Sequence, residues 1–146
     1  MMNIEKASDK DYDALVNVWE SAVRATHHFL SEEDINALKS QLKANYFPQV
    51  ILYLVRDSEQ QIQGFLGVAD NRIEMLFIDA LSRGQGVGKA LITFAITALG
   101  CDEVDVNEQN PQAVGFYLHQ GFEQVGRSPV DGQGRPFPLL HLKLQR

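Results

Sequence analysis

The 146-residue chain is poor in cysteine and tryptophan, and it contains no long run of apolar residues. Cys101 is its one cysteine, so no disulfide can form within the chain, and nothing in the sequence indicates an oxidising compartment. No stretch approaches the roughly 20 apolar residues of a membrane-spanning helix, and residues 1–7 lack the apolar core of a secretory signal. We therefore expect a cytoplasmic protein that is neither exported nor inserted into a membrane.

Basic residues are also scarce. The chain has 13 Lys and Arg against 19 Asp and Glu, which gives a formal net charge of −6. Proteins that bind nucleic acids normally show a basic excess or a basic stripe, so we expect no nucleic-acid partner. An acidic protein is better suited to a cationic or amine substrate. No cluster of His, Cys and carboxylate residues occurs at metal-ligand spacing, so the sequence predicts no metal site.

Length and composition predict an ordered enzyme-sized domain. Hydrophobic residues make up 45% of the chain and charged residues 22%, which is ordinary for a globular protein. A chain of this length buries roughly two thirds of its unfolded surface, so its core needs no disulfide or metal. No repeat or linker divides the sequence, and we expect one domain over residues 1–146.

Hydrophobic periodicity and helix-capping patterns predict the order β-α-α-β-β-β-α-β-α-β-β. Ser8 with Asp11, and Ser31 with Asp34, form capping-box patterns before two helices, and Pro48 is expected to end the second. The predicted strands are residues 4–7, 50–56, 62–68, 72–79, 103–107, 122–127 and 139–143. The predicted helices are residues 12–23, 32–46, 87–98 and 111–119.

The most informative segment is the glycine run at residues 83–88, which lies between a predicted buried strand and an amphipathic helix. Alternating glycines leave backbone N–H groups uncovered at the positive end of a helix dipole, which suits a pyrophosphate. The run does not match the dinucleotide fingerprint, because the sixth position from Gly84 is Lys89. It does not match a Walker A loop either, since Gly84 and Gly88 enclose only three residues and Ala90 follows Lys89.

The run instead resembles the Arg/Gln-x-x-Gly-x-Gly/Ala signature of the GNAT superfamily of N-acetyltransferases, which holds the pyrophosphate of acetyl-coenzyme A. Residues 110–122 resemble the second signature of that superfamily, an Asn three residues before Ala, an aromatic-Tyr pair and Gly-Phe. The segments 26–30 and 138–142 are similar to those of a group of small bacterial acetyltransferases within it. Ala80 departs from the pattern, because many relatives carry proline there.

This resemblance implies an α/β (α+β) fold with a central mixed, mostly antiparallel sheet of about seven strands, flanked by four helices and splayed between the fourth and fifth strands. Acetyl-coenzyme A would enter at the splay, with its pantetheine arm along the fourth strand. The cofactor-binding residues implied in this way are Leu76, Phe77, Ile78, Arg83, Gly84, Gln85, Gly86, Val87, Gly88, Lys89, Asn110 and Tyr117. By burial alone, Leu76, Phe77 and Ile78 would be core residues, and Asn110 would be explained by helix capping.

Two residues are implied to be catalytic. Tyr117 corresponds to the tyrosine whose hydroxyl protonates the departing coenzyme A thiolate, although spacing alone is equally typical of a core aromatic residue. Glu74 corresponds to the carboxylate that several members use, often through water, to take the proton of the amine. A solvent-facing strand residue is the alternative for Glu74.

His27, His28 and Phe29 lie between the first two helices, where the family builds its acceptor pocket, and His27 is a second candidate base. The resemblance thus implies an enzyme that transfers acetyl from acetyl-coenzyme A directly to a primary amine of a small molecule, peptide or protein in a ternary complex, as a monomer or homodimer. The alternative is a non-catalytic acyl-coenzyme A sensor or partner-binding module on the same fold.

Overall fold

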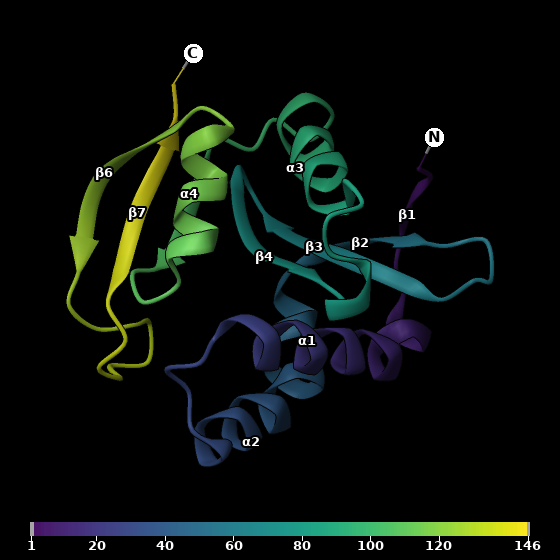
Figure 1. Cartoon of the computed structure of the whole chain (residues 1–146), viewed down its shortest axis with the longest axis horizontal. Helices are drawn as coiled ribbons and strands as arrows, with labels where there is room; N and C mark the ends of the chain where they lie inside the picture. The colour runs from purple at the N-terminus through teal and green to yellow at the C-terminus, as the bar shows by residue number, and fades with distance from the viewer. Residues whose placement is uncertain (1, 146) are drawn as a thin grey trace. The chain divides into compact units, whose positions relative to one another are not determined.

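The computed structural model describes residues 2–145. Over these residues, seven strands and four α-helices follow one another in the predicted order, with short turns of 3-10 and π helix between them (Figure 1). The predicted α/β fold class is therefore confirmed. The chain forms two compact units, one ending at Cys101 and one beginning at Asp102.

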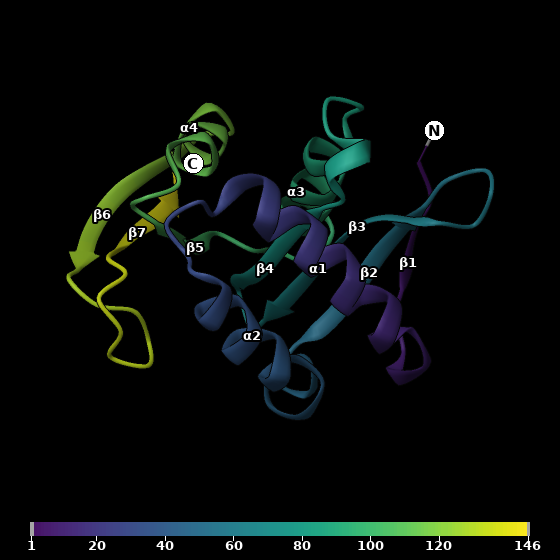
Figure 2. The same cartoon turned by 60° about the horizontal axis from the view of Figure 1, so that its bottom comes forward.

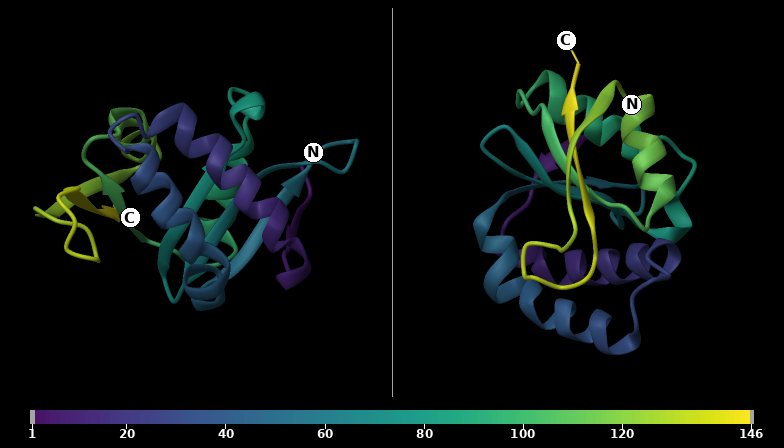
Figure 3. Two further views of the ribbon diagram at one scale, coloured as in Figure 1. Left: turned by 90° about the horizontal axis from the view of Figure 1, so that it is seen from below. Right: turned by 90° about the vertical axis from the view of Figure 1, so that its left-hand side faces the viewer.

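The first unit contains an antiparallel sheet in the order β1-β2-β3-β4. Its strands are β1 (Ile4–Lys6), β2 (Ile51–Arg56), β3 (Ile62–Ala69) and β4 (Arg72–Ile78). Its helices are α1 (Tyr12–Thr26), α2 (Glu32–Gln41) and α3 (Val87–Thr97). Helices α1 and α2 lie on one face of the sheet and α3 lies on the other, as the labelled view in Figure 2 and the left panel of Figure 3 show.

The main core of this unit lies between the sheet and α1. Apolar residues recur at helical spacing along α1, and Leu15, Trp19 and Val23 are among those it buries. They pack with Phe65 of β3 and with Phe47, which is fully buried before β2. The opposite face of the sheet is covered by the apolar side of α3, the helix that follows the glycine run.

Local sequence signals set the helix starts. Both predicted capping boxes form, with Asp11 accepting from the backbone of Ser8 at 2.9 Å and Asp34 accepting from that of Ser31 at 3.0 Å. The expectation that Pro48 ends a continuous helix was wrong. Helix α2 ends at Gln41 and is followed by a π turn (Leu42–Tyr46) and a 3-10 turn (Phe47–Gln49). Pro48 lies near the start of the 3-10 turn, where a backbone N–H is not needed.

The second unit is an antiparallel sheet in the order β5-β7-β6 with one helix packed against it (Figure 1; Figure 3, right). Its elements are β5 (Glu103–Asn107), α4 (Pro111–His119), β6 (Phe122–Ser128) and β7 (Leu139–Leu144). Val104, Leu142 and Phe122 are buried on the face that α4 covers. Asp105 and His141 lie on the other face, because side chains alternate along a strand.

Two expectations stay predictions. The splay between β4 and β5 falls at the boundary of the two units, and the single domain over residues 1–146 is not tested by the structure. In residues 2–145, none of the helices combines the length and the apolar character needed to cross a membrane.

Candidate active site

The glycine run forms a turn that opens α3. Gly84 and Gly86 have φ angles of 80° and 83°, in the left-handed region where residues with a Cβ are strained, and Gly86 is the N-cap residue. The first intrahelical bond is from the N–H of Ala90 to the carbonyl of Gly86, at 3.0 Å. The N–H groups of residues 87–89 thus have no acceptor within the helix, and no acidic side chain lies in its first turn.

The approach to this turn is open. A Cβ built at Gly84 would meet nothing within 4 Å, and one at Gly86 would meet only the Met2 methyl at 3.9 Å. The two glycines therefore satisfy a backbone conformation rather than close packing within the protein. Free N–H groups, a positive helix end and open space are what a phosphate group requires, so the turn fits the pyrophosphate of coenzyme A.

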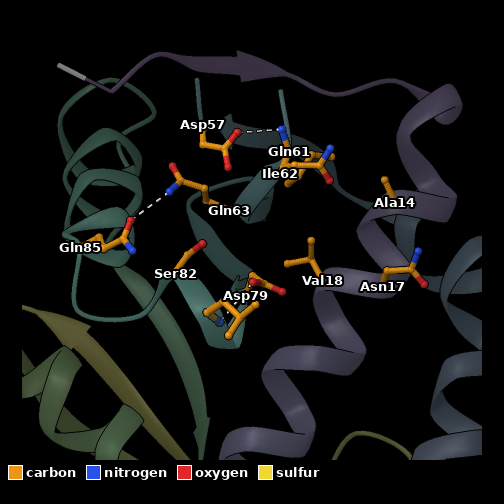
Figure 4. A pocket seen from close by; sticks show the side chains of 11 residues that line it. Ala14, Asn17, Val18, Asp57, Gln61, Ile62, Gln63, Asp79, Ser82 and Gln85 are labelled. Atoms are coloured by element: carbon orange, nitrogen blue, oxygen red, sulfur yellow. Dashed lines mark hydrogen bonds between the residues drawn. The ribbon is translucent and has the colours of Figure 1, made fainter. Parts of the chain in front are cut away.

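The Gln85 side chain is directed toward β3 by a hydrogen bond. It accepts a hydrogen bond from Gln63 at 3.2 Å, at the edge of a pocket of about 540 Å³ (Figure 4). Among residues 2–145, the charged residues that line the pocket are Asp57 and Asp79, with no Lys, Arg or His. Two carboxylates repel a phosphate, so the pocket is not an anion site. The predicted contact of Gln85 with the cofactor stays a prediction.

The loop between β4 and the glycine run is held by α1. Asp79 caps the 3-10 turn Ala80–Ser82 by accepting from the N–H of Leu81 at 3.2 Å. The N–H of Ala80 donates to the Ser21 hydroxyl at 3.0 Å. Proline has no N–H, so the departure at Ala80 replaces a rigid ring with a hydrogen bond that ties the loop to α1.

Glu74 is the extra residue of a β-bulge on β4. The register pairs Gly67 with Met75 and Val68 with Ile73, which leaves Glu74 without an opposite residue on β3. Its side chain is 41% exposed, with Arg72 Nε 3.8 Å from its Oε1 atom. Bulges occur next to active sites, where they redirect a side chain and increase the strand twist. Glu74, the predicted base, thus lies at a bulge with a partly exposed side chain. Its catalytic role stays a prediction.

The bulge also decides which way the following residues face. Met75 and Phe77 pack toward the core under α1, whereas Leu76 pairs with Leu66 on the opposite face. Leu76, Phe77 and Ile78 are all half-buried. Their predicted contact with pantetheine is not tested.

His27 is the C-cap residue of α1, and its ring lies in aromatic surroundings. The centroid of Phe29 is 5.4 Å from that of His27, and the centroid of Phe77 is 6.3 Å from it. Burial, and secondarily the charge of His28, lowers the pKa of His27 to about 4. His27 is therefore neutral at physiological pH. His28 is exposed, so the structure brings His27, Phe29 and Phe77 together and leaves His28 outside this group.

The tautomer of His27 follows from its hydrogen bond to Thr26. The Thr26 hydroxyl donates to the carbonyl of Ala22 at 2.8 Å and lies 2.7 Å from His27 Nδ1. A hydroxyl has one proton, so it must accept from Nδ1, and the lone pair of the neutral ring is on Nε2. Within residues 2–145, His27 Nε2 has no hydrogen-bond partner. Every fully buried polar side-chain atom in that range does have one, so Nε2 reaches solvent.

We expect His27 to make stability depend on pH. The unfolded chain takes up the imidazole proton near pH 6.5 and the folded chain only near pH 4, so stability falls as pH falls from 6.5 toward 4. At about 1.4 kcal/mol per pH unit, wild type should lose about 2 kcal/mol more between pH 7 and pH 5 than His27→Gln. Urea unfolding at pH 5, 6 and 7 measures this slope. Parallel curves for the two proteins would refute the assignment of a neutral His27.

The second unit holds the other predicted residues, on α4. Asn110 is buried, and its Oδ1 accepts from the N–H of Ala113 at 3.3 Å, with Pro111 in the first helical position. This confirms the predicted N-cap. Tyr117 is 7% exposed and packs against Phe116 and Phe122, with ring centroids 5.3 and 5.7 Å away. Burial raises the pKa of Tyr117 well above its usual value, so its phenol keeps its proton.

Three residues that position the candidates match none of the sequence motifs. Thr26 sets the tautomer of His27, Ser21 holds Ala80, and Gln63 holds Gln85. Thr26 had a sequence signal, because a threonine in the last turn of a helix can bond to the carbonyl four residues earlier. The other two pairs join residues far apart in the chain, and no local pattern indicates them. Among residues 2–145 there is no group of three or more His, Cys, Asp or Glu placed to hold a metal.

Comparisons with known proteins identify the family of the chain. A family model described as an acetyltransferase (GNAT) domain matches residues 20–138. The chain is 39% identical to the peptidyl-lysine N-acetyltransferase YjaB of Salmonella typhimurium over 145 residues, 97% of each chain. It is 37% identical to YjaB of Escherichia coli over 142 residues, which cover 97% of this chain and 96% of the relative.

Solved structures with a similar fold include members of the same family. The solution structure of apo-form YjaB from Escherichia coli superposes with a TM-score of 0.88 at 36% identity, covering 98% of this chain and 97% of that one. A PaiA N-acetyltransferase from Thermoplasma acidophilum, solved in complex with coenzyme A, shares the fold with a TM-score of 0.76 at 19% identity, covering 99% of each chain. The chain belongs to the GNAT family of acetyltransferases, and it is an N-acetyltransferase that acts on an amine.

Proposed function

We propose that this enzyme transfers the acetyl group of acetyl-coenzyme A to the side-chain amine of a lysine in a peptide or protein, within one ternary complex. The observation that carries the proposal is the glycine turn at the start of α3, with free N–H groups and open space before it. The printed names of the YjaB relatives support a peptidyl-lysine acceptor. We also propose that the enzyme is located in the cytoplasm and that it is a monomer or a homodimer.

The donor is held by backbone groups. The N–H groups of the turn and of the first helical residues bind the pyrophosphate, with Arg83 and Lys89 adding positive charge. Leu76, Phe77 and Ile78 of β4 and Asn110 before α4 are the proposed contacts of the pantetheine arm. The bound thioester supplies an activated acetyl group, and the chain's task is to orient the amine toward it. Such orientation can contribute about 7 to 11 kcal/mol.

The acceptor lysine needs an uncharged nitrogen. A lysine ammonium has a pKa near 10.4, so releasing one proton to solvent to give the free amine at pH 7 costs about 4.6 kcal/mol. His27 offers Nε2 as a hydrogen-bond acceptor for an N–H of that amine, beside the rings of Phe29 and Phe77. With a pKa of about 4, the His27 imidazole is some six units too weak to deprotonate the ammonium by itself, so it orients the amine.

Glu74 is the proposed proton acceptor. Once the nitrogen is bonded to the acetyl carbon its proton becomes strongly acidic, and a carboxylate can take it directly or through water. The bulge leaves the Glu74 side chain partly exposed to solvent and so able to pass the proton on. An α-amino group, with a pKa of about 7.7 to 8.0, would cost less than about 1.4 kcal/mol to present uncharged at pH 7. Tyr117 is proposed to donate a hydrogen bond to the leaving sulfur.

The non-catalytic alternative predicts cofactor binding without turnover, and the YjaB relatives favour the enzyme. Purified protein, acetyl-coenzyme A and a lysine peptide should release free thiol at a rate proportional to enzyme. Mass spectrometry should find one acetyl group on lysine and none on a matched norleucine peptide. If no thiol is released, calorimetry with acetyl-coenzyme A shows whether the protein still binds the donor. Binding without thiol release on any amine would favour the sensor, and absence of binding would overturn the proposal.

A further inference from the structure

A chain of three polar side chains crosses the sheet of the second unit on the face opposite α4. His141 of β7 lies between the other two, with its Nδ1 2.7 Å from Asp105 Oδ1 on β5 and its Nε2 2.7 Å from Ser128 Oγ on β6. The side chains of Asp105 and His141 are about one third exposed, at 32% and 34%. The three groups therefore form one hydrogen-bonded relay that remains open to solvent.

The direction of each hydrogen bond follows from the groups involved. An ionised carboxylate can only accept, so His141 Nδ1 donates to Asp105. In the neutral ring Nε2 then carries the lone pair, and Ser128 donates its hydroxyl proton to it. A hydroxyl within hydrogen-bond reach of a base, with the base oriented by a third group, is the arrangement that activates a serine nucleophile. That arrangement is recognised by geometry and not by the order of residues in the chain.

A second β-bulge brings Ser128 to this face. The register pairs Gln124 with Leu142 and Gly126 with His141, so Val125 is an extra residue on β6. Phe122 and Gln124 precede the bulge and share the face of Leu142, under α4. Without the extra residue, alternation would place Ser128 on that buried face as well. The bulge instead directs Ser128 toward His141.

Gly126 makes room for the imidazole. A Cβ at this position would lie 3.3 Å from His141 Cδ2, tighter than an ordinary contact. The absent side chain therefore lets the ring lie across the strand between its two partners. In the described part of the chain β6 ends the strand order, so no further strand covers Ser128 from its outer edge.

We propose that Ser128, His141 and Asp105 form a nucleophilic site in which Ser128 accepts an acyl group from small, activated acyl esters. Ser128 Oγ attacks the carbonyl carbon and its proton passes to His141 Nε2. An Oγ–C bond forms as the bond to the leaving oxygen breaks, and the proton leaves with the alcohol or returns to solvent. Water then hydrolyses the acyl-serine, so each cycle consumes one ester and one water. Asp105 holds the ring and is a positioning residue.

This site is separate from the proposed acetyl transfer to lysine, which uses neither Ser128 nor His141. Its test therefore needs no coenzyme A. Two probes are suitable: p-nitrophenyl acetate, which releases a coloured leaving group on acylation, and a small alkyl fluorophosphonate, which traps an activated serine permanently. Peptide mass spectrometry then identifies the modified residue in the wild-type protein, independently of how any variant folds.

We expect the fluorophosphonate to modify Ser128 with one-to-one stoichiometry. His141→Gln should slow labelling about 10²-fold, the low end for general base catalysis, and Asp105→Asn should slow it at least about tenfold. Nitrophenolate release should fall in parallel. Ser40 is the matched control serine, because it is exposed and its hydroxyl proton is donated to the carbonyl of Ala37 and not to a base. Labelling of Ser128 no faster than Ser40, or unchanged in His141→Gln, would overturn the proposal.

Discussion

Tyr117→Phe should lower turnover of acetyl-coenzyme A and a lysine peptide about 10²-fold, while acetyl-coenzyme A binds with near wild-type affinity. The substitution keeps the ring that packs between Phe116 and Phe122, and removes only the hydroxyl. In residues 2–145 that hydroxyl makes no hydrogen bond that would be lost. Stability should therefore change little, and the effect should appear in kcat.

The size of this effect follows from two pKa values. Burial raises the pKa of Tyr117, so the phenol is a reliable donor but a reluctant acid. The thiol of coenzyme A resembles that of cysteine, with a pKa near 8.5, so the thiolate leaves in part without help. Tyr117 thus stabilises the leaving sulfur by a hydrogen bond more than by complete proton transfer. General acid catalysis spans about 10² to 10⁴, and the low end is expected here.

A matched control comes from Tyr53, whose ring packs against Phe94 with centroids 5.0 Å apart in the first unit. Tyr53→Phe also removes one phenolic hydroxyl from a packed ring, and kcat should remain that of wild type. Steady-state kinetics and calorimetry on both variants separate turnover from binding. A Tyr117→Phe enzyme within twofold of wild type would show that Tyr117 is a packing residue.

Local features were predictable from the sequence because their causes are local. The glycine spacing before α3, the Asn110–Pro111 helix start and the two capping boxes each depend on residues within one turn of each other. The strand limits follow from alternation and from turn residues, and β5 has the predicted limits, residues 103–107. The GNAT resemblance used these same local motifs.

The bulges at Glu74 and Val125 were not predictable in the same way. Each depends on how a strand aligns with its partner, and one extra residue reverses the face of every side chain beyond it. Alternation alone would have placed Ile73 and Met75 on one face, whereas the bulge places them on opposite faces. The contact between Ser128 and His141 depends on such a shift, so no pattern of residues along the chain indicates this cluster.

The second large expected effect is on acetyl-coenzyme A binding at the glycine turn before α3. Gly86→Val should weaken acetyl-coenzyme A binding at least about 10²-fold, because hydrogen bonds to a charged group contribute about 1.5 to 3 kcal/mol each and at least two should be lost. The branched side chain would extend into the open space before the helix, where the phosphates are expected. It would also strain a residue at φ 83°, which alone lowers stability. Calorimetric affinity must therefore be separated from folding.

Gly100→Val provides that separation. Gly100 has φ 71° and nothing within 4 Å of a built Cβ, so valine there imposes the same kind of strain away from the glycine turn. Both variants should lose similar thermal stability, and only Gly86→Val should lose affinity. Lys89→Ala removes an exposed point charge and keeps the backbone donors, so its loss should be smaller than that of Gly86→Val. Equal affinities for the two valine variants would mean that the turn does not hold the phosphates, since strain would then account for everything observed.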